Sequence, residues 1–484
     1  MFRLSRARGC KNWKKEVFSL TTIFSEPFDL FRTSPRERAI ADLHEATALY
    51  TIEPVVMDLL DCLPWPDGDK KLLDAGAGGG NFLKEAIRRL LEAEPDITPD
   101  RLCHLVEGWE IYPLAVEEAR RGIASLLCSH GWSSPVAART ADCLVVNGDF
   151  LTSYPGRGTV DVIAGNPPFL RYANLAELLR LEYEECVPAF AQKDLLYSFL
   201  NRCVEALSPD GILGLICSDR WLFNSGAAGL REVLGRRIGI ESIKRLDSSS
   251  FYRPKDRRAG TPPRVHPVAV VMKTGEAKIS LGREAIYPDA ADSRTSGALT
   301  LADIASVRIC PWLGKEGVFV VDAATAERLP GEYLVPAVDT DDIRDGVLQK
   351  PTRYAIRTFP GVEPPQEIVR HLRGALHRLS ATGRRRKDWW LPPETWHNMP
   401  LDQEAFLIPR IAKGLRYVKL PALHLGINHN LSIIAPTPEK MLQVEAVLNS
   451  DEAQEWVRNR APRLENGFLS ITTSFLRQLP LPGR

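Results

Sequence analysis

The sequence predicts a doubly wound α/β domain, with helices on both faces of a mostly parallel sheet, followed by a C-terminal domain of mixed α/β character. Between about residues 72 and 273, short aliphatic runs alternate with helix-like stretches. Continuous aliphatic strands separated by crossover helices are typical of a parallel sheet that is buried on both faces. After Gly275 this alternation stops. The 484-residue length also exceeds that of one ordinary domain.

These changes of pattern suggest four regions along the chain. The opening "MFRLSRARGCKNWKKEVF" is basic but has no continuous apolar core and no clear cleavage site, so we expect a solvated arm rather than a targeting peptide. The stretch "MLQVEAVLNSDEAQEWVRNRAP" near the end predicts one amphipathic helix. The expected regions are an arm at 1–44, the α/β domain at 45–275, a connecting segment at 276–335 and a second domain at 336–484.

Composition limits the possible partners and cofactors. The formal net charge of +1 gives no global reason to bind nucleic acid, so any basic surface must be local. The nine cysteines are scattered without C-x-x-C spacing, and no histidine motif typical of zinc sites occurs. We therefore expect neither a metal site nor a disulfide framework, and a reducing, cytoplasmic location. No apolar run approaches the ~18 residues that a membrane span requires.

Polar groups follow the first two aliphatic runs of the α/β domain. "LLDAGAGGGNF" ends a strand at Asp74 and continues into a glycine-rich turn with Gly76 and Gly78. Glycines let a ligand approach the backbone, although a tight structural turn would also use them. Glu110 ends the next run, where a carboxylate can accept both hydroxyls of a ribose. A helix N-terminal charge is the alternative interpretation of Glu110. The spacing fits neither a dinucleotide fingerprint nor a P-loop.

The next two runs end in residues suited to an adenine ring and an amine. In "VVNGDFLTS", Asp149 can accept from an exocyclic amine and Phe150 can cover a purine, although Asp149 alone could be a surface turn residue. In "DVIAGNPPFLRY", Asn166-Pro167-Pro168-Phe169 ends a buried strand. Two prolines stiffen this segment because each fixes φ and removes an N–H donor.

The tetrapeptide at 166–169 suits chemistry on an amine that is conjugated with an aromatic base. The Asn166 side-chain oxygen and the Pro167 carbonyl can both accept from that amine, which localises its lone pair toward an electrophile. Such preorganised acceptors require no strong general base. Phe169 offers a face on which a base rotated out of a duplex can stack.

These motifs, in this order, resemble the gamma class of S-adenosylmethionine-dependent adenine-N6 DNA methyltransferases, typified by the Taq enzyme, whose catalytic domain has a Rossmann-like sheet. The resemblance implies that Asp74, Gly76 and Gly78 line the cofactor. It further implies that Glu110 holds the ribose, that Ile111, Asp149 and Phe150 hold the adenine, and that Asn166 to Phe169 are catalytic. Thr51, in "TIEP" where the family has Thr-Pro, would contact the methionine end. Phe251, with Tyr252 as its rival, would stack on the second face of the target base.

The second domain would read DNA. Arg384-Arg385-Arg386-Lys387 precedes Trp389, Trp390 and Trp396, and Lys413 and Arg416 form a second basic cluster. Such mixtures can contact phosphates and stack on bases, although a solvated basic loop above core tryptophans is the alternative. A DNA enzyme needs an additional surface to read base edges, which a target-recognition domain would supply.

We therefore expect a site-specific, adenine-specific DNA methyltransferase that binds duplex DNA, with a cognate restriction endonuclease, if present, on a separate chain. A cytosine-N4 DNA enzyme, an RNA or protein-glutamine methyltransferase, and a non-catalytic DNA-binding specificity subunit are the alternatives. Cytosine-N4 enzymes more often carry Ser at the first tetrapeptide position, so Asn166 favours adenine. No Pro-Cys dipeptide supports a cytosine-C5 mechanism.

Overall fold

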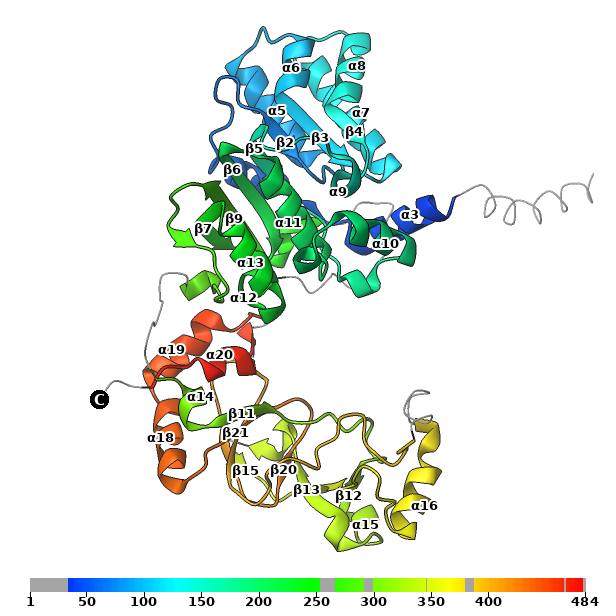
Figure 1. Cartoon of the computed structure of the whole chain (residues 1–484), viewed down its shortest axis with the longest axis vertical. Helices are drawn as coiled ribbons and strands as arrows, with labels where there is room; N and C mark the ends of the chain where they lie inside the picture. Colours follow the sequence, from blue (N-terminus) through cyan, green and yellow to red (C-terminus); the bar gives the residue numbers. More distant parts are fainter. Residues whose placement is uncertain are drawn as a thin grey trace, which may run out of the picture. The chain divides into compact units, whose positions relative to one another are not determined.

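The computed structural model describes residues 34–252, 266–290, 299–344, 346–378, 387–464 and 467–481. The chain divides into two compact units, Met1–Pro288 and Asp289–Arg484 (Figure 1). The segment 276–335, expected from sequence to connect two domains, therefore contributes to both units.

The first unit is built on one eight-stranded sheet that confirms the predicted fold class. Strands β2 to β6 pair in parallel, and β9 pairs antiparallel with β6 and β7. The aliphatic runs that predicted the sheet, which are the four described above together with "GILGLICS" and "HPVAVVMK", all form strands of it. In sheet order, the strands are β10 (Ile279–Ser280), β7 (Ile238–Arg245), β9 (Pro267–Thr274), β6 (Leu207–Ser218), β5 (Val160–Gly165), β2 (Leu72–Asp74), β3 (Val106–Glu110) and β4 (Val145–Asn147).

The strand order reverses between β2 and β5. The chain steps outward from β2 through β3 to β4 and then returns to β5 on the other side of β2. Because parallel crossovers are right-handed, these two directions place their connecting helices on opposite faces of the sheet. Ligands of open α/β sheets bind beyond the carboxyl ends of the strands at such a reversal.

Eleven α-helices of the first unit lie within the described residues. They are α3 (Pro35–Thr47), α4 (Glu53–Leu60), α5 (Asn81–Ala93), α6 (Pro99–Leu105), α7 (Pro113–Ser129), α8 (Ser134–Leu144), α9 (Phe150–Ser153), α10 (Glu177–Cys186), α11 (Leu195–Ala206), α12 (Arg220–Phe223) and α13 (Ala228–Leu234). Helix α3 begins with a capping box between Ser34 and Glu37. Most of α3 lies in the segment that the sequence assigned to an arm.

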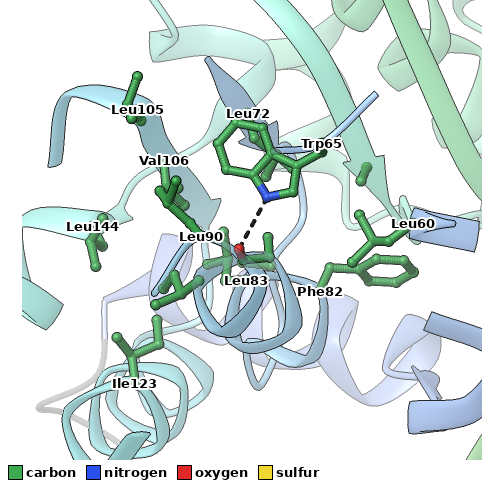
Figure 2. Packing of buried hydrophobic residues seen from close by; sticks show 14 of the residues in the cluster. Leu60, Trp65, Leu72, Phe82, Leu83, Leu90, Leu105, Val106, Ile123 and Leu144 are labelled. Carbon is green, nitrogen blue, oxygen red and sulfur yellow. Dashed lines mark hydrogen bonds between the residues drawn. The ribbon is translucent and has the colours of Figure 1, made fainter. Parts of the chain in front are cut away.

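The apolar faces of α5, α7 and α8 form one core with buried residues of strands β2, β3, β4 and β5 (Figure 2). Leu83 and Leu90 of α5 and Ile123 of α7 are fully buried. Burying each such side chain contributes about 1.5–3 kcal/mol. The Trp65 indole N–H donates to the Ala86 carbonyl oxygen at 3.0 Å, so the one polar atom of this ring is satisfied inside the core.

The second unit contains two four-stranded sheets, which are mixed with short helices. In sheet order, the first has β11 (Ser306–Ile309), β21 (Leu431–Ile434), β17 (Ala405–Ile408) and β19 (Val418–Leu420), and the second has β12 (Val320–Asp322), β16 (Arg353–Ile356), β13 (Leu334–Val338) and β20 (Leu425–Gly426). Two short pairs are β14 (Ile343–Arg344) with β15 (Val347–Leu348) and β18 (Ile411–Ala412) with β22 (Leu469–Ser470). The helices are α14 (Leu301–Ile304), α15 (Ala323–Ala326), α16 (Gln366–Gly374), α18 (Pro438–Leu448), α19 (Asp451–Arg460) and α20 (Thr473–Arg477).

The prediction of a single amphipathic helix near the C-terminal end is wrong, because two helices form there. Helix α18 ends at Leu448, and Ser450 starts α19 as its N-cap: the Ser450 hydroxyl accepts from the Ala453 N–H at 3.1 Å. Serine competes well for this capping position, which explains the break. None of the helices in the described segments has both the length and the apolar character needed to cross a bilayer.

Candidate functional site

A pocket lies at the carboxyl ends of β2, β3, β4 and β5. Seven of the eight residues predicted from sequence to bind a cofactor line it, and Asp74 lies just behind the wall. Asn166, Pro167 and Pro168 also line the pocket, whereas Phe169 does not. The pocket therefore stands at the strand-order reversal, where the sheet topology favours ligand binding.

The glycine-rich turn packs directly against Asp74. The Gly76 N–H donates to Asp74 Oδ1 at 3.2 Å, while Oδ2 is buried without a hydrogen-bond partner among the described residues. A Cβ atom on Gly165, at the end of β5, would lie 2.6 Å from Asp74 Oδ1. Burial raises the pKa of Asp74 to about 7. The site thus holds a carboxyl group that a cationic ligand would shift toward its ionised form.

Glu110 joins the end of β3 to the same turn. Its Oε2 accepts from the Gly78 N–H at 2.9 Å and its Oε1 accepts from the Tyr112 N–H at 2.8 Å. Gly78 has a φ of +50°, and a Cβ there would lie 2.9 Å from the Tyr50 ring. Burial raises the pKa of Glu110, and the backbone N–H donors oppose that rise. Each carboxylate oxygen retains acceptor capacity toward the pocket, because an oxygen has two lone pairs.

Asp149 ends the β4 segment and caps helix α9. Its Oδ1 accepts from the Leu151 N–H at 3.0 Å, and its Oδ2 lies 3.6 Å from Arg36 Nη2 of α3. Arg36 also bonds both carboxylate oxygens of Glu182 on α10, at 3.1 and 3.2 Å. Burial raises the pKa of Asp149, and the Arg36 charge is among the interactions that oppose the rise. Phe150, which follows Asp149, is buried beneath the pocket.

Asn166 stands at the end of β5 with its side-chain amide oriented by a distant part of the chain. Its Nδ2 donates to the Leu49 carbonyl oxygen at 2.8 Å and lies 3.3 Å from Thr51 Oγ1. Its Oδ1 is buried and has no hydrogen-bond partner among the described residues. The arrangement leaves a fixed acceptor in the pocket wall, beside the rigid Pro167 and Pro168.

Thr51 and the two candidate base-stacking aromatics share one two-stranded pair. Strand β1 (Tyr50–Thr51) pairs antiparallel with β8 (Phe251–Tyr252). Phe251 packs against the core cluster of the first unit, whereas Tyr252 is 43% exposed and its hydroxyl accepts from Asn81 Nδ2 at 2.9 Å. Neither aromatic lines the pocket.

Only some of the basic residues predicted to contact DNA lie among the residues that the structure describes. Arg384, Arg385 and Arg386 lie outside the described residues, and the neighbouring Lys387 is exposed. Lys413 and Arg416 are also exposed, with the Lys413 ammonium 5.5 Å from the Phe468 ring centroid. The tryptophans that accompanied the first cluster belong to a core: Trp396 is buried, and Trp389 and Trp390 pack against it.

Sequence reasoning missed several pocket residues that come from helices. Leu43 and His44 of α3, Tyr183 of α10 and Phe199 of α11 all line the pocket. The His44 ring stacks on Tyr112 with centroids 3.9 Å apart. The Ser34 and Glu37 capping pair, which is visible in the sequence, could have indicated that a helix begins here and that the chain is ordered.

The pocket residues fit S-adenosylmethionine. Three carboxyl groups, those of Asp74, Glu110 and Asp149, can accept from a cationic amino acid, a ribose and an adenine amine, respectively. Gly78 has a positive φ and lies against the Tyr50 ring, so only glycine fits this turn of the pocket wall without strain. Within the described residues, no group of three or more His, Cys, Asp or Glu could hold a metal ion.

Comparison with known proteins supports the same assignment. Residues 140–251, which include Asp149 and the 166–169 tetrapeptide, match the Eco57I restriction-modification methylase family. The chain is 25% identical to the type II methyltransferase M.PaeR7I of Pseudomonas aeruginosa, over 90% of this chain and 85% of that protein. It is 24% identical to the type II methyltransferase M.XhoI of Xanthomonas vasicola, over 90% and 91% of the two chains.

A solved structure shows the fold over nearly the whole chain. The type IIL restriction-modification enzyme MmeI, in complex with DNA, superposes with a TM-score of 0.58 at 13% identity, covering 94% of this chain and 67% of the other. The chain is therefore a restriction–modification-type methyltransferase that uses S-adenosylmethionine.

Proposed function

We propose that this methyltransferase modifies the N6 amine of an adenine that is rotated out of duplex DNA. The observation that carries the proposal is the buried Oδ1 of Asn166, which has no hydrogen-bond partner among the described residues and whose amide nitrogen is held by Leu49. A buried acceptor without a partner costs about 1–3 kcal/mol, so its retention indicates a ligand donor at that point. An exocyclic amine supplies such a donor.

The catalytic role of Asn166 follows from the direction of its side chain. With Nδ2 engaged by Leu49, only Oδ1 can accept from the amine of the target base. We assign the Pro167 carbonyl as the second acceptor, so that the nitrogen lone pair is localised without a strong base. Phe169 would stack on the target ring, and Phe251 or Tyr252 would cover its other face. When bound, S-adenosylmethionine supplies the methyl group from its sulfonium centre.

The cofactor roles are assigned to the pocket walls. Asp74 would meet the cationic amino acid end, and Glu110 the ribose hydroxyls. Asp149 would accept from the adenine amine, with Ile111 and Phe150 against the ring. Gly76, Gly78 and Thr51 would complete the wall around the methionine portion.

The second unit would recognise the target sequence. We assign residues 336–484 to DNA recognition, with Lys387, Lys413 and Arg416, together with the arginines at 384–386, contacting phosphates. The names of the related type II methyltransferases suggest a restriction–modification setting in the cytoplasm. A separate endonuclease chain would then be the cognate partner.

The test is methyl transfer from tritiated S-adenosylmethionine to unmethylated genomic DNA, followed by digestion to nucleosides. Wild type should label N6-methyladenine, and Asn166→Ala should lose the label while retaining cofactor binding. Asn174→Ala is the matched control, because Asn174 is an exposed asparagine near the tetrapeptide whose side chain lies outside the pocket lining. Label in N4-methylcytosine would overturn the choice of base. Cofactor binding with no label on DNA would favour an RNA or protein substrate, or a non-catalytic specificity subunit.

A further inference from the structure

The catalytic tetrapeptide is followed by exposed positive charge. Arg171 lies two residues after Phe169, and Lys193 and Arg220 are also exposed. The sequence analysis assigned no role to any of these three residues. Their places in the fold bring them to the edge of the sheet where Asn166 stands.

Backbone contacts bring Arg171 and Lys193 together. The Leu195 N–H donates to the Leu170 carbonyl oxygen at 2.8 Å, and the Tyr172 N–H donates to the Lys193 carbonyl oxygen at 3.3 Å. Arg171 and Asp194 form an isolated antiparallel bridge. The segment leaving the tetrapeptide therefore runs beside the segment that enters α11.

Arg220 approaches the same place from the neighbouring strand. It starts α12 just after β6, and β6 is parallel to β5, so both strands end at the same edge. Its charge acts on the Asp194 carboxyl group, as does that of Arg171. The turn that follows α12 also reaches Lys193, because a Cβ on Gly226 would lie 3.6 Å from Lys193 Cδ.

The three cations have no carboxylate partner of their own among the residues that the structure describes. Within the described part of the chain, none has a carboxylate oxygen within 4.0 Å, whereas Arg88, Arg101, Arg180 and Arg202 of the same unit all form ion pairs. Asp194, the carboxylate nearest in sequence, accepts from the Leu196 N–H at 3.1 Å. Three exposed cations that have no ion pair among the described residues, gathered around Asp194, give a local positive surface on a chain whose formal net charge is only +1.

We propose that Arg171, Lys193 and Arg220 form a phosphate-binding rim, which contacts the DNA backbone on either side of the nucleotide that enters the catalytic pocket. This inference rests on the proposed function, because it takes DNA as the substrate. It adds a backbone contact surface on the catalytic unit itself, apart from the basic clusters of the second unit. Phosphate contacts of this kind position a duplex and do not depend on its sequence.

The experiment measures binding of a short fluorescein-labelled DNA duplex at several salt concentrations. Replacing each rim residue by glutamine should weaken binding about 3- to 10-fold and reduce the slope of log affinity against log salt by about 0.9 per residue. Arg171→Lys and Arg220→Lys should keep the wild-type slope, because the charge is retained. The dissociation constant for S-adenosylmethionine should stay unchanged in every variant.

Arg139→Gln is the matched control, because Arg139 is an exposed arginine of α8, which packs beside the opposite edge strand β4. It should leave both the affinity and the salt slope at wild-type values. Suppose that the wild-type protein methylates DNA and that a variant with all three rim residues replaced by glutamine binds DNA with the wild-type salt slope. This result would overturn the proposed rim but not the proposed function. A wild-type protein that binds cofactor but neither binds nor methylates DNA would instead overturn the proposed function, and the rim with it.

Discussion

The Asn166 amide nitrogen donates to the Leu49 carbonyl oxygen at 2.8 Å, and this one bond fixes which end of the amide faces the pocket. Leu49 lies 117 residues earlier in the chain. A carbonyl oxygen can only accept, so it requires the NH₂ end of the amide on its side. The acceptor end, Oδ1, is thereby directed to the position where a target amine would donate.

The Leu49 carbonyl predicts that Asn166→Asp is strongly impaired in this protein. An ionised aspartate has no donor and would place a carboxylate against the carbonyl oxygen. Losing the bond and introducing repulsion should cost about 2–3 kcal/mol, or roughly 30- to 150-fold in kcat. Lowering the pH should restore part of the activity, because a protonated carboxyl group can donate to Leu49. Single-turnover methylation between pH 6 and 8.5 measures this. Full activity at every pH would contradict the orienting role of Leu49.

Glu110→Gln should weaken cofactor binding and also lower the stability of the fold. Both carboxylate oxygens accept backbone N–H groups, from Gly78 and Tyr112, and a glutamine amide can satisfy only one of them. One buried donor would then lack a partner, and the ribose would lose an acceptor, so the dissociation constant should rise about 30- to 100-fold. Calorimetry measures it. Glu107→Gln on the same strand is the control, because the Glu107 carboxylate accepts from the Trp109 indole and lies outside the pocket lining.

The raised pKa of Asp74 predicts that S-adenosylmethionine binds more tightly as pH rises toward 8. Burial raises this pKa from 3.8 to about 7 in the free protein. A cationic ligand favours the ionised form, so binding near pH 6.5 should release about one proton. Calorimetry in buffers of different ionisation enthalpy counts that proton. Methylthioadenosine, which lacks the cationic amino acid end that Asp74 would meet, should show a weaker pH dependence. A flat affinity from pH 5.5 to 8 would contradict the prediction.

The raised pKa of Asp74 also predicts how the free energy of unfolding of the ligand-free protein changes with pH. A carboxyl group whose pKa is raised by folding binds more protons in the folded than in the unfolded state between pH 3.8 and about 7. Its contribution to the free energy of unfolding is therefore present at low pH and is lost as pH rises through about 7. Saturating cofactor should reduce that loss, which thermal unfolding at several pH values with and without ligand can measure.

Much of the sheet and of the strand-end chemistry could be predicted because both depend on local sequence. Aliphatic runs fix β2, β3, β4, β5, β6 and β9, and parallel strands end at a common edge, so their last polar residues converge. Strand β7 was not predicted, because Ile238–Arg245 alternates exposed and half-buried residues in its second half and contains no continuous aliphatic run. Its antiparallel pairing with β9 stabilises it through tertiary contacts that the sequence does not reveal.

The orientation of the side chains in the site could not be predicted, because it depends on contacts between residues that are distant in the sequence. The Asn166 motif indicates an acceptor, but only the fold places Leu49 beside it. Likewise, Arg36 belonged to a segment that seemed from its sequence to be a solvated arm, yet it contacts Asp149 and Glu182 across more than 100 residues. Sequence periodicity carries no information on such pairings.

The contacts of Arg36 predict that this residue positions Asp149 for the cofactor. Arg36 lies 3.6 Å from Asp149 and bonds Glu182, so it ties α3 to the adenine end of the pocket. Arg36→Met should remove the cation that helps to keep the buried carboxylate ionised. Because the arginine side chain is itself 41% exposed, solvent screens part of the effect, and we expect only about a 3- to 10-fold weaker affinity for S-adenosylmethionine.

The matched controls separate this positioning role from helix stability. Arg38→Met alters an exposed arginine of the same helix and should leave the cofactor affinity unchanged. Arg36→Lys should recover part of the loss, because it keeps the charge but not the bidentate contact with Glu182. In a double-mutant cycle, Arg36→Met should cost little further affinity once Asp149 is replaced by asparagine, since the charge that it compensates is gone. Additive losses in that cycle would show that α3 acts on the pocket without Asp149.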